Sequence, residues 1–518
     1  MTEDLELARG PTRKRRPSVT RNLAANLVGQ AWITLMMIGF VPVFIRHLGI
    51  EAYGIIGLFT TFQALLAILD AGMGPTLNRE MARFTSGARE ASHTLDLLRT
   101  LETLAALLAG ALAGTLILLA KPLSTSWLNP ETLPREMIRT ALMLMGAALA
   151  CRFLESIYRA SLLGLQQQVW YNGANILLNT LRHAGAATLV AYLSANLTTF
   201  FAWYLAISVL IVGVLRWKLL RVLPHPDRPT RFSVDELIQI RHFAMGMLAV
   251  SVLAVSLTQV DKLLLSQLLP LESFGVYMLS FSVASILGLI AAAVTQALLP
   301  VMVEQVTRSN FLHLHRIFHF AAQIVAIFVV PVGLLLMVFP RDLLFLWSGD
   351  PALAHSAAPI LRLLAAGSTL HALLTVPYFS MVAHGWTRLA VLTNIIAVCL
   401  LVPSILIAVP AFGMEAAAII WILLNAGYLL FQIPLVHRHI LTGEMWRWYR
   451  ADVAQPILIA SFVVMALAAI RPHLELSRLM LMPWLLVSWA VMVAALLLSA
   501  QEELRERLAA LRHSPQAG

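Results

Sequence analysis

Long apolar runs, separated by short polar connections, extend over almost the whole chain. Fourteen runs approach the length of about 20 residues that a helix needs to cross the hydrocarbon core of a membrane. No period-2 alternation of the kind seen in membrane barrels appears in them. The pattern predicts an all-α polytopic membrane protein with 14 transmembrane helices, at roughly 22–45, 53–77, 100–120, 139–163, 172–193, 199–216, 243–267, 274–302, 320–340, 359–383, 388–410, 415–436, 452–471 and 480–500.

The composition agrees with this interpretation. Of the 518 residues, 59% are hydrophobic and 12% are charged, whereas a soluble protein carries about 25% charged residues. The net charge of +10 comes from basic residues scattered singly between apolar runs, which argues against nucleic-acid binding. Cys151 and Cys399 each lie inside an apolar run, so they provide neither a disulfide framework nor a metal site.

Lysine and arginine are distributed unevenly over the connections. With the N-terminus inside, 25 of the 37 fall on cytoplasmic segments and four within the membrane runs. Eight fall on outer connections: Arg46, Lys121, Arg135, Arg139, Arg341, Arg362, Arg471 and Arg478. This bias predicts a multi-pass protein whose N- and C-termini are both cytoplasmic.

One short pattern occurs twice in the chain. The segments GIEAYGIIGL at 49–58 and PLESFGVYML at 270–279 share a Glu, a small residue, an aromatic residue and a Gly, 221 residues apart. Glu51 and Glu272 thus occupy matching outer hinges, where an acid can cap the N-terminus of the next helix. The shared phase, which holds through two helices, indicates that the protein contains two copies of one unit.

Each copy contains six helices, so both copies start on the inside. Such parallel repeats are related by an axis along the membrane normal, and a substrate site is expected between them near mid-membrane. The predicted organisation is a cytoplasmic basic tail at 1–21, an N-lobe at 22–216, a cytoplasmic inter-lobe linker at 217–242, a C-lobe at 243–436, two further helices at 437–500 and a cytoplasmic tail at 501–518.

Three stretches carry a family resemblance. NLAANLVGQAWITLMMIGFVPVFIRHLGIEAYGIIGLFTTFQALLAILDAGMGPTLNREMAR resembles the opening of the Wzx-type oligosaccharide flippases, the polysaccharide transporter branch of the MOP superfamily. TQVDKLLLSQLLPLESFGVYMLS is similar to the start of the second half in that family, and FGMEAAAIIW is similar to a further family stretch.

The resemblance implies a MATE/MurJ-like fold of two pseudo-symmetric six-helix lobes around a V-shaped cavity, worked by alternating access. It implies a flippase for an oligosaccharide linked to undecaprenyl pyrophosphate, in the bacterial inner membrane, for O-antigen or exopolysaccharide biosynthesis. The last two helices would form a groove for lipid tails. The implied partners are the lipid-linked oligosaccharide, membrane lipid, a polysaccharide polymerase and a chain-length regulator.

Ionisable side chains inside the apolar runs are functional candidates, because each costs several kcal/mol unless it faces a cavity or a partner. Two runs each place three polar side chains on one helix face: Arg152, Glu155 and Arg159 at 139–163, and Asn175, Asn179 and Arg182 at 172–193. The run at 243–267 has Gln259 and Lys262 on one stripe, with Asp261 adjacent. Asp70 precedes a Gly-Met-Gly-Pro segment that can loosen the end of its helix.

These residues predict a cationic substrate site. Four cations, Arg152, Arg159, Arg182 and Lys262, outnumber the acids nearest to them, which suits an anionic head group because arginine matches phosphate oxygens bidentately. The other candidate substrate-binding residues are Asn175, Asn179 and Gln259, and the candidates for gating or ion coupling are Asp70, Glu155 and Asp261. Local ion pairing of the same residues is the alternative.

The histidines show no metal-binding pattern. His315 and His319 are spaced i, i+4 in HLHRIFH, but no acid is near them in sequence. We therefore expect them on a solvated or lipid-facing surface.

The sequence also limits the function. It has no GxxxxGKS phosphate loop, so the chain is not expected to be an ATPase, and neither a cofactor nor a catalysed reaction is expected. The sequence does not choose among an ion gradient, the membrane potential and cargo consumption as energy source. Two alternatives stay open: a cation-coupled multidrug antiporter of the same superfamily, and a membrane polysaccharide polymerase or ligase.

Overall fold

The computed structural model describes residues 19–70, 72–87, 90–224, 230–471 and 477–500. Within these ranges the chain is helical apart from short turns and one isolated β-bridge between Asn129 and Pro270. Eleven helices in the described ranges are long and apolar enough to cross a membrane. The predicted all-α polytopic fold is confirmed, whereas the count of 14 stays a prediction. Most of the two predicted tails lies outside the described residues.

The chain divides into two compact units. Unit 1 comprises Met1–Val41, Leu66–Ala120 and Thr140–Ala249, and unit 2 comprises Pro42–Leu65, Lys121–Arg139 and Val250–Gly518. Both units draw residues from the predicted N-lobe. The lobe boundaries expected from the sequence stay a prediction.

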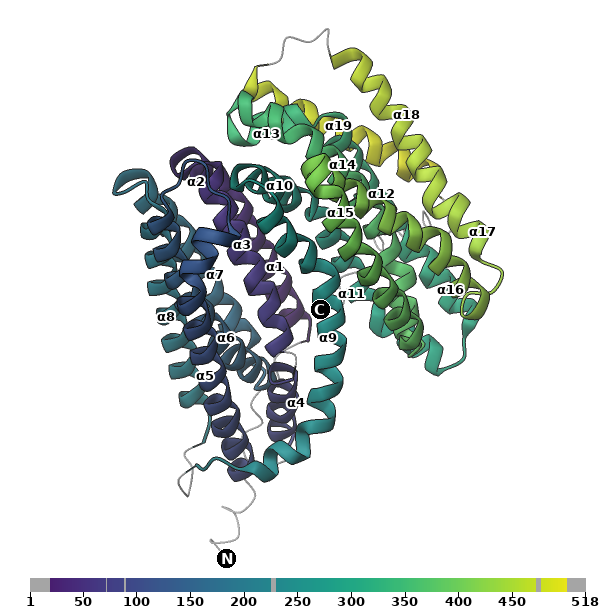
Figure 1. Cartoon of the computed structure of the whole chain (residues 1–518). Helices are drawn as coiled ribbons and strands as arrows, with labels where there is room; N and C mark the ends of the chain where they lie inside the picture. Colours follow the sequence, from purple (N-terminus) through teal and green to yellow (C-terminus); the bar gives the residue numbers. More distant parts are fainter. Residues whose placement is uncertain (1–18, 71, 88–89, 225–229, 472–476, 501–518) are drawn as a thin grey trace, which may run out of the picture. The chain divides into compact units, whose positions relative to one another are not determined.

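Unit 1 is built from antiparallel helices joined by short connections. Within it, α7 packs against both α1 and α8. The N-terminus of α8 is capped by Asn196, whose side chain accepts a hydrogen bond from the backbone N–H of Thr198. The helices that contribute to unit 1 are α1 (Val19–Gly39), α4 (Gly74–Thr85), α5 (Ala91–Pro122), α6 (Arg135–Gly164), α7 (Gln168–Tyr192), α8 (Leu197–Val222) and α9 (Val234–Leu268) (Figure 1).

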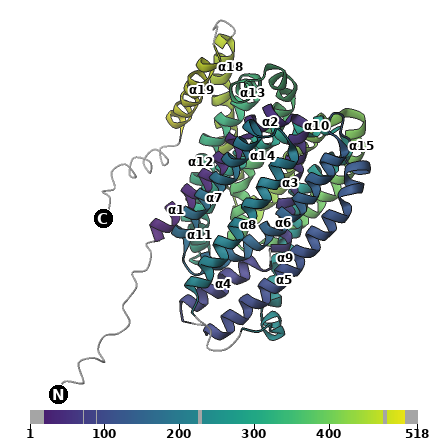
Figure 2. The same ribbon diagram turned by 90° about the vertical axis from the view of Figure 1, so that its left-hand side faces the viewer.

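Unit 2 has its core around α12, which packs against α11, α14, α18 and α19. In addition to the second half of α9, its helices are α2 (Val41–Leu48), α3 (Ile50–Asp70), α10 (Leu271–Ala284), α11 (Ile286–Thr307), α12 (Phe311–Val338), α13 (Pro340–Ser348), α14 (Pro351–Ala383), α15 (Thr387–Gly427), α16 (Ile433–His439), α17 (Met445–Arg447), α18 (Gln455–Ile470) and α19 (Arg478–Ser499). Three π-helical turns interrupt the chain: η1 (Leu123–Trp127), η2 (Tyr428–Gln432) and η3 (Trp448–Ala454). Figure 2 shows α18 and α19 side by side at the C-terminal end.

The long α15 is two helices joined at a sharp bend. Gly413 has φ 69° and ψ −157°, a backbone conformation that residues with a side chain rarely adopt. The break falls between the predicted runs at 388–410 and 415–436. A glycine therefore makes the turn between two helices of this unit.

The two copies of the repeated pattern meet in unit 2. A methyl group placed on Gly54 would lie 3.0 Å from the carbonyl oxygen of Leu271, and one placed on Gly275 would collide with the carbonyl oxygen of Ile50. Ile50 and Leu271 are themselves 221 residues apart, so the contact between α3 and α10 is reciprocal. This is a local two-fold relation in the phase read from the sequence. Superposition of the complete halves stays a prediction.

Glu51 anchors a loop rather than capping its own helix. Its buried carboxylate accepts hydrogen bonds from the backbone N–H groups of Glu131, Thr132 and Leu133 at 2.6, 3.0 and 2.8 Å, and from the Thr132 hydroxyl at 2.6 Å. Glu272, at the matching position, is exposed. The expected capping role is therefore replaced, for Glu51, by a contact across about 80 residues of sequence.

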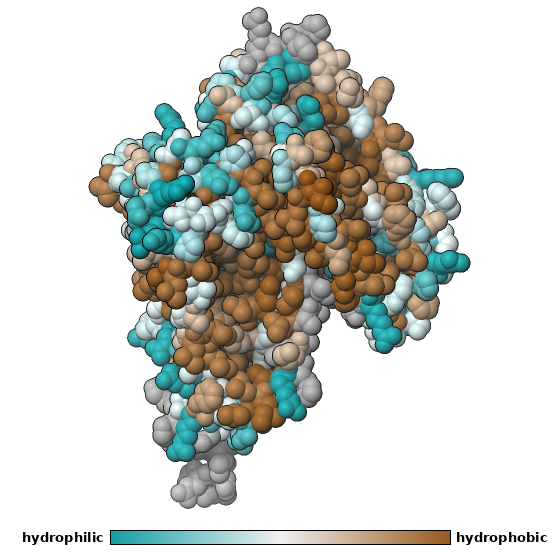
Figure 3. Space-filling view, in the orientation of Figure 1, coloured by the Kyte–Doolittle hydropathy of each residue, from teal (hydrophilic) through white to brown (hydrophobic). Residues whose placement is uncertain are grey.

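Hydrophobic side chains cover much of the visible surface. Figure 3 shows them over the middle stretches of the helices, while hydrophilic side chains gather towards helix ends. Leu118, Ile407 and Phe462 are each more than 70% exposed. Large apolar surfaces of this extent are typical of helices that face lipid.

Candidate functional site

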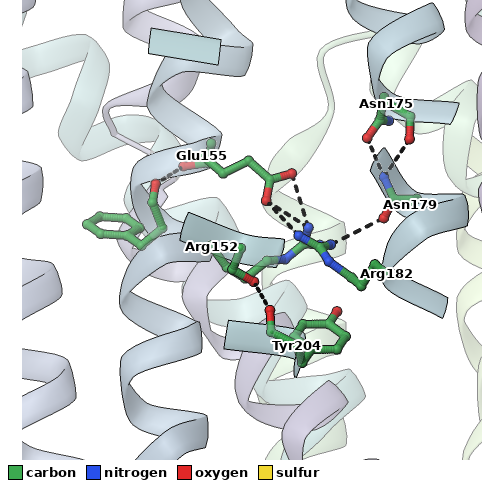
Figure 4. A network of polar contacts seen from close by, with 9 residues as sticks. Arg152, Glu155, Asn175, Asn179, Arg182 and Tyr204 are labelled. Atoms are coloured by element: carbon green, nitrogen blue, oxygen red, sulfur yellow. Dashed lines mark hydrogen bonds and ion pairs between the residues drawn. The ribbon is translucent and has the colours of Figure 1, made fainter. Parts of the chain in front are cut away.

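In unit 1, two arginines from neighbouring helices share one glutamate (Figure 4). Arg152 Nη1 on α6 lies 3.1 and 2.9 Å from the two carboxylate oxygens of Glu155. Arg182 Nη2 on α7 lies 3.4 Å from Oε2 of the same carboxylate, and its Nη1 donates to Asn179 Oδ1 at 3.2 Å. Asn179 in turn donates to the side chain of Asn175. We call these five residues the arginine cluster.

Burial makes this arrangement electrostatically demanding. The side chains of Arg182 and Glu155 are 1% and 8% exposed, whereas Arg152 is 29% exposed. The Arg182 guanidinium also lies 4.8 Å from the centre of the Tyr204 ring, a favourable cation–π distance. Two guanidinium groups and one carboxylate leave the arginine cluster with a formal charge of +1.

The third arginine of α6 belongs to a different contact. Arg159 Nη2 lies 3.8 Å from Oδ2 of Asp70, at the end of α3, and its side chain is 47% exposed. Asp70 also accepts a hydrogen bond from the Ser156 hydroxyl at 2.9 Å. Arg159 and Asp70 are therefore neutralised by each other, which is the partnering expected if Asp70 is not a cation site.

Unit 2 contains a cavity of about 140 Å³. Helices α9, α10, α11, α14 and α15 supply its walls, which combine aromatic rings with a few polar groups. The lining residues are Thr258, Asp261, Lys262, Tyr277, Phe281, Ser285, Gly288, Leu364, Ser368, His371 and Trp421. Mostly apolar walls with a few fixed polar groups are the usual form of a small-molecule site.

Lys262 is held firmly in the wall of this cavity. Its Nζ lies 3.1 and 3.0 Å from the two oxygens of Asp261, 2.7 Å from the Thr258 carbonyl oxygen and 3.8 Å from the centre of the Phe281 ring. The Tyr277 hydroxyl donates to Asp261 at 3.4 Å. The cation and the acid predicted from the sequence thus form a neutral pair.

The opposite wall was missed by the sequence analysis. His371 accepts or donates one hydrogen bond through Nδ1 to Asn425 Oδ1 at 3.0 Å, and its ring lies 5.3 Å from that of Trp421. Within the described residues, Nε1 of Trp421 has no hydrogen-bond partner although it is buried. Ser368, His371 and Thr375 are spaced i, i+3, i+7, so the test applied to the other runs would have revealed this polar face.

The structure brings some predicted residues together and leaves others apart from them. The arginine cluster unites five of them in unit 1, and the cavity holds Asp261 and Lys262 in unit 2. Gln259 does not line the cavity; its Nε2 lies 3.3 Å from the Thr258 hydroxyl. Glu155 and Asp261 pair locally, as the pairing alternative expects, while binding of an anionic group by the arginines stays a prediction.

Comparison with known proteins places the chain in a family. Residues 19–306 match the family described as "Polysaccharide biosynthesis protein", and residues 247–421 match the family described as "MatE". The chain is 20% identical over 406 residues to the "Putative O-antigen transporter" of Shigella flexneri, which covers 78% of this chain and 94% of that protein.

Solved structures show the same fold. The lipid II flippase MurJ in an inward closed conformation is similar with a TM-score of 0.70 and 13% identity, over 92% of this chain and 97% of that one. An inward-facing multidrug resistance MATE transporter of the MOP superfamily is similar with a TM-score of 0.63 and 14% identity, over 82% and 99%. These relatives are transporters and flippases rather than enzymes.

The helices and the comparisons agree with each other. The apolar helices make the chain a multi-pass membrane protein, and its similar structures are membrane transporters. The family match covers more than half of the sequence and includes both copies of the repeated pattern. The chain therefore belongs to the polysaccharide biosynthesis protein family, and the resemblance to Wzx-type flippases of the MOP superfamily is confirmed.

Proposed function

We propose that the protein is a flippase that moves an oligosaccharide linked to undecaprenyl pyrophosphate across the bacterial inner membrane by alternating access. Its cargo would serve O-antigen or exopolysaccharide biosynthesis. The observation that carries this proposal is the family match over residues 19–306, joined by similarity to an O-antigen transporter over most of both chains.

The chemistry of the arginine cluster supports an anionic cargo. Glu155 neutralises only one of two guanidinium groups, and Arg152 remains partly exposed. A pyrophosphate offers oxygens to a guanidinium fork in the same geometry as a carboxylate does. We therefore propose that the cargo's phosphates compete with Glu155 for Arg152, while Arg182 and Asn179 keep Glu155 in place.

The cavity in unit 2 supports a polar, uncharged part of the cargo. Its one cation and one acid neutralise each other, and its remaining polar groups stand beside the aromatic rings of Tyr277, Phe281 and Trp421. We propose that it takes up part of the glycan. The unpartnered Nε1–H of Trp421 is a donor that a sugar hydroxyl would satisfy.

A drug–cation antiporter is the second candidate, because residues 247–421 match the MatE family and an acid lines the cavity. A cationic drug needs an acid with free charge. Asp261 already spends its charge on Lys262, with an Nζ–Oδ2 distance of 3.0 Å. The geometry therefore favours the flippase.

Surface glycan display in a flippase-null strain tests the proposal. We expect Arg152→Ala and Arg182→Ala to abolish display at a normal level of inserted protein, because the phosphate-binding charge is lost while Glu155 keeps one arginine partner. Arg182→Lys should restore display only in part, since lysine keeps the charge and loses the fork. Arg139→Ala is the matched control, because Arg139 is 42% exposed and pairs only with the exposed Glu136.

Two results would count against this assignment. Normal display by the alanine variants at normal protein level would remove the arginines from the transport site. Lost display together with lost protein would assign them to structural pairing alone. Failure of the wild-type chain to restore display, combined with increased drug resistance, would favour the antiporter.

A further inference from the structure

A buried histidine lies between two carboxylates in unit 2, away from the residues assigned to cargo. His319 on α12 contacts Asp452 of η3 through Nδ1 and Glu444, just before α17, through Nε2 at 3.0 Å. The side chains of His319 and Asp452 are 3% and 0% exposed. The expectation of a solvated or lipid-facing surface is therefore wrong for His319, because its two acidic partners come from 125 and 133 residues further along the chain.

The hydrogen-bond geometry fixes a proton count. A neutral imidazole has one N–H donor, and its other nitrogen is an acceptor. Here both ring nitrogens face carboxylate oxygens, which are themselves acceptors. The three groups therefore need one proton more than a neutral histidine with two carboxylates provides, placed either on the imidazole or on a carboxyl group.

The surroundings keep the two carboxylates in position. Gln323 Nε2 donates to Asp452 Oδ1 at 3.0 Å. His315 Nδ1 and Arg447 Nη1 lie 3.3 and 3.7 Å from the Glu444 carboxylate. Burial raises the pKa of Glu444, but its contacts with His319, His315 and Arg447 lower it more, so the net pKa lies below the ordinary value.

One more titratable group faces the same place from α16. The His437 ring stacks edge-on with Phe318 at 5.8 Å, and its Nδ1 lies 3.0 Å from the Ile433 carbonyl oxygen. His437 is thus engaged with the backbone and contacts neither carboxylate directly. The charged and titratable groups that face His319 are Asp452, Glu444, His315, Arg447 and His437.

A small cavity adjoins the buried end of this cluster. It measures about 20 Å³ and is lined by Gln323, Ala451, Gln455 and Ser499, among others. This volume is large enough for one water molecule, and the polar lining offers it partners. Gln323, which binds Asp452, forms part of the wall, so water can come close to the acid without unfolding of the unit.

We propose that His319, Asp452 and Glu444 form a proton-binding site that fastens residues 444–454 to α12. With the proton bound, both carboxylates are paired with an N–H donor. Without it, one buried carboxylate faces a nitrogen lone pair, and an unpaired buried acid is costly. Loss of the proton therefore loosens the segment that carries η3, whose π-helical turn places Asp452 towards α12.

Hydrogen exchange of the full-length protein in lipid nanodiscs tests this site with the proton as the probe. Protection of the amides at 441–455 is measured from pH 5.5 to 8.5 and corrected for intrinsic exchange rates. Since the native site holds the extra proton, protection in the wild type should fall as the pH rises, by about tenfold for one unit of difference in proton affinity. His319→Gln should be poorly protected at every pH, with no such decrease.

Two variants separate His319 from its neighbours. His315→Gln changes a histidine on the same Glu444, and His384→Gln changes one that needs a single proton for the Ser380 carbonyl oxygen at 2.8 Å. Both should keep the wild-type dependence on pH. Flat protection in the wild type would overturn the proposal. So would a dependence that survives in His319→Gln or disappears in His315→Gln.

Discussion

The residue scale shows how much one buried carboxylate can organise. Glu51 accepts four hydrogen bonds from the segment 131–133, which precedes α6. Hydrogen bonds to a charged group contribute about 1.5–3 kcal/mol each, more than neutral ones. The loop depends on this acid because its backbone N–H groups have no helix or strand to pair with.

Replacing Glu51 with Gln should therefore destabilise the protein by about 2–4 kcal/mol, since the charge is lost and an amide N–H₂ faces N–H donors. Thermal unfolding of the purified protein measures this as a lower Tm. The matched control is Glu272→Gln, because Glu272 occupies the equivalent repeat position and is exposed. Equal effects of the two substitutions would contradict the anchoring role.

Single residues were the least predictable part of the molecule. Helical spacing correctly grouped Asn175, Asn179 and Arg182 on one face, because that relation is local. Partners such as Asp452 for His319 are more than 100 residues distant, and no spacing reveals them. Their contact exists only once tertiary packing has formed.

At the scale of elements, the apolar runs predicted where helices lie, and a glycine marks the bend in α15. The π-helical turns were not predictable. A π turn gains its stability from contacts with other elements rather than from local sequence, and η3 illustrates this because its Asp452 pairs with α12. The small α4 and α13 likewise lie outside the predicted runs.

The contact between α3 and α10 makes a prediction at this scale. Gly275→Ala should lower the Tm, because the added methyl group collides with the Ile50 carbonyl oxygen, which belongs to a helix backbone and cannot move aside. Gly213→Ala in α8 is the matched control. It has open space within 4 Å, and Ala is favoured over Gly in a helix by about 1 kcal/mol. A Gly275→Ala protein as stable as Gly213→Ala would show that the helices are not closely packed there.

At the scale of the whole molecule, pattern and charge predict different things. Periodicity and apolar length predicted the fold class, which the helices and the similar structures confirm. The two six-helix lobes rest on a repeat of 221 residues, seen directly only where Ile50, Gly54, Leu271 and Gly275 meet. Orientation rests on charge alone, because helices of either direction bury the same apolar surface in lipid.

The orientation is therefore the last prediction. Lysine and arginine resist translocation, and 25 of them fall on the predicted inner segments against eight outside, so both termini should be cytoplasmic. Green fluorescent protein fused after Gly518 should be fluorescent, and alkaline phosphatase fused there should be inactive. A phosphatase fusion truncated after Glu131, in a predicted outer connection, is the positive control and should be active. An active phosphatase after Gly518 would place the C-terminus outside. With a cytoplasmic N-terminus, that result would require an odd number of crossings and would contradict fourteen helices.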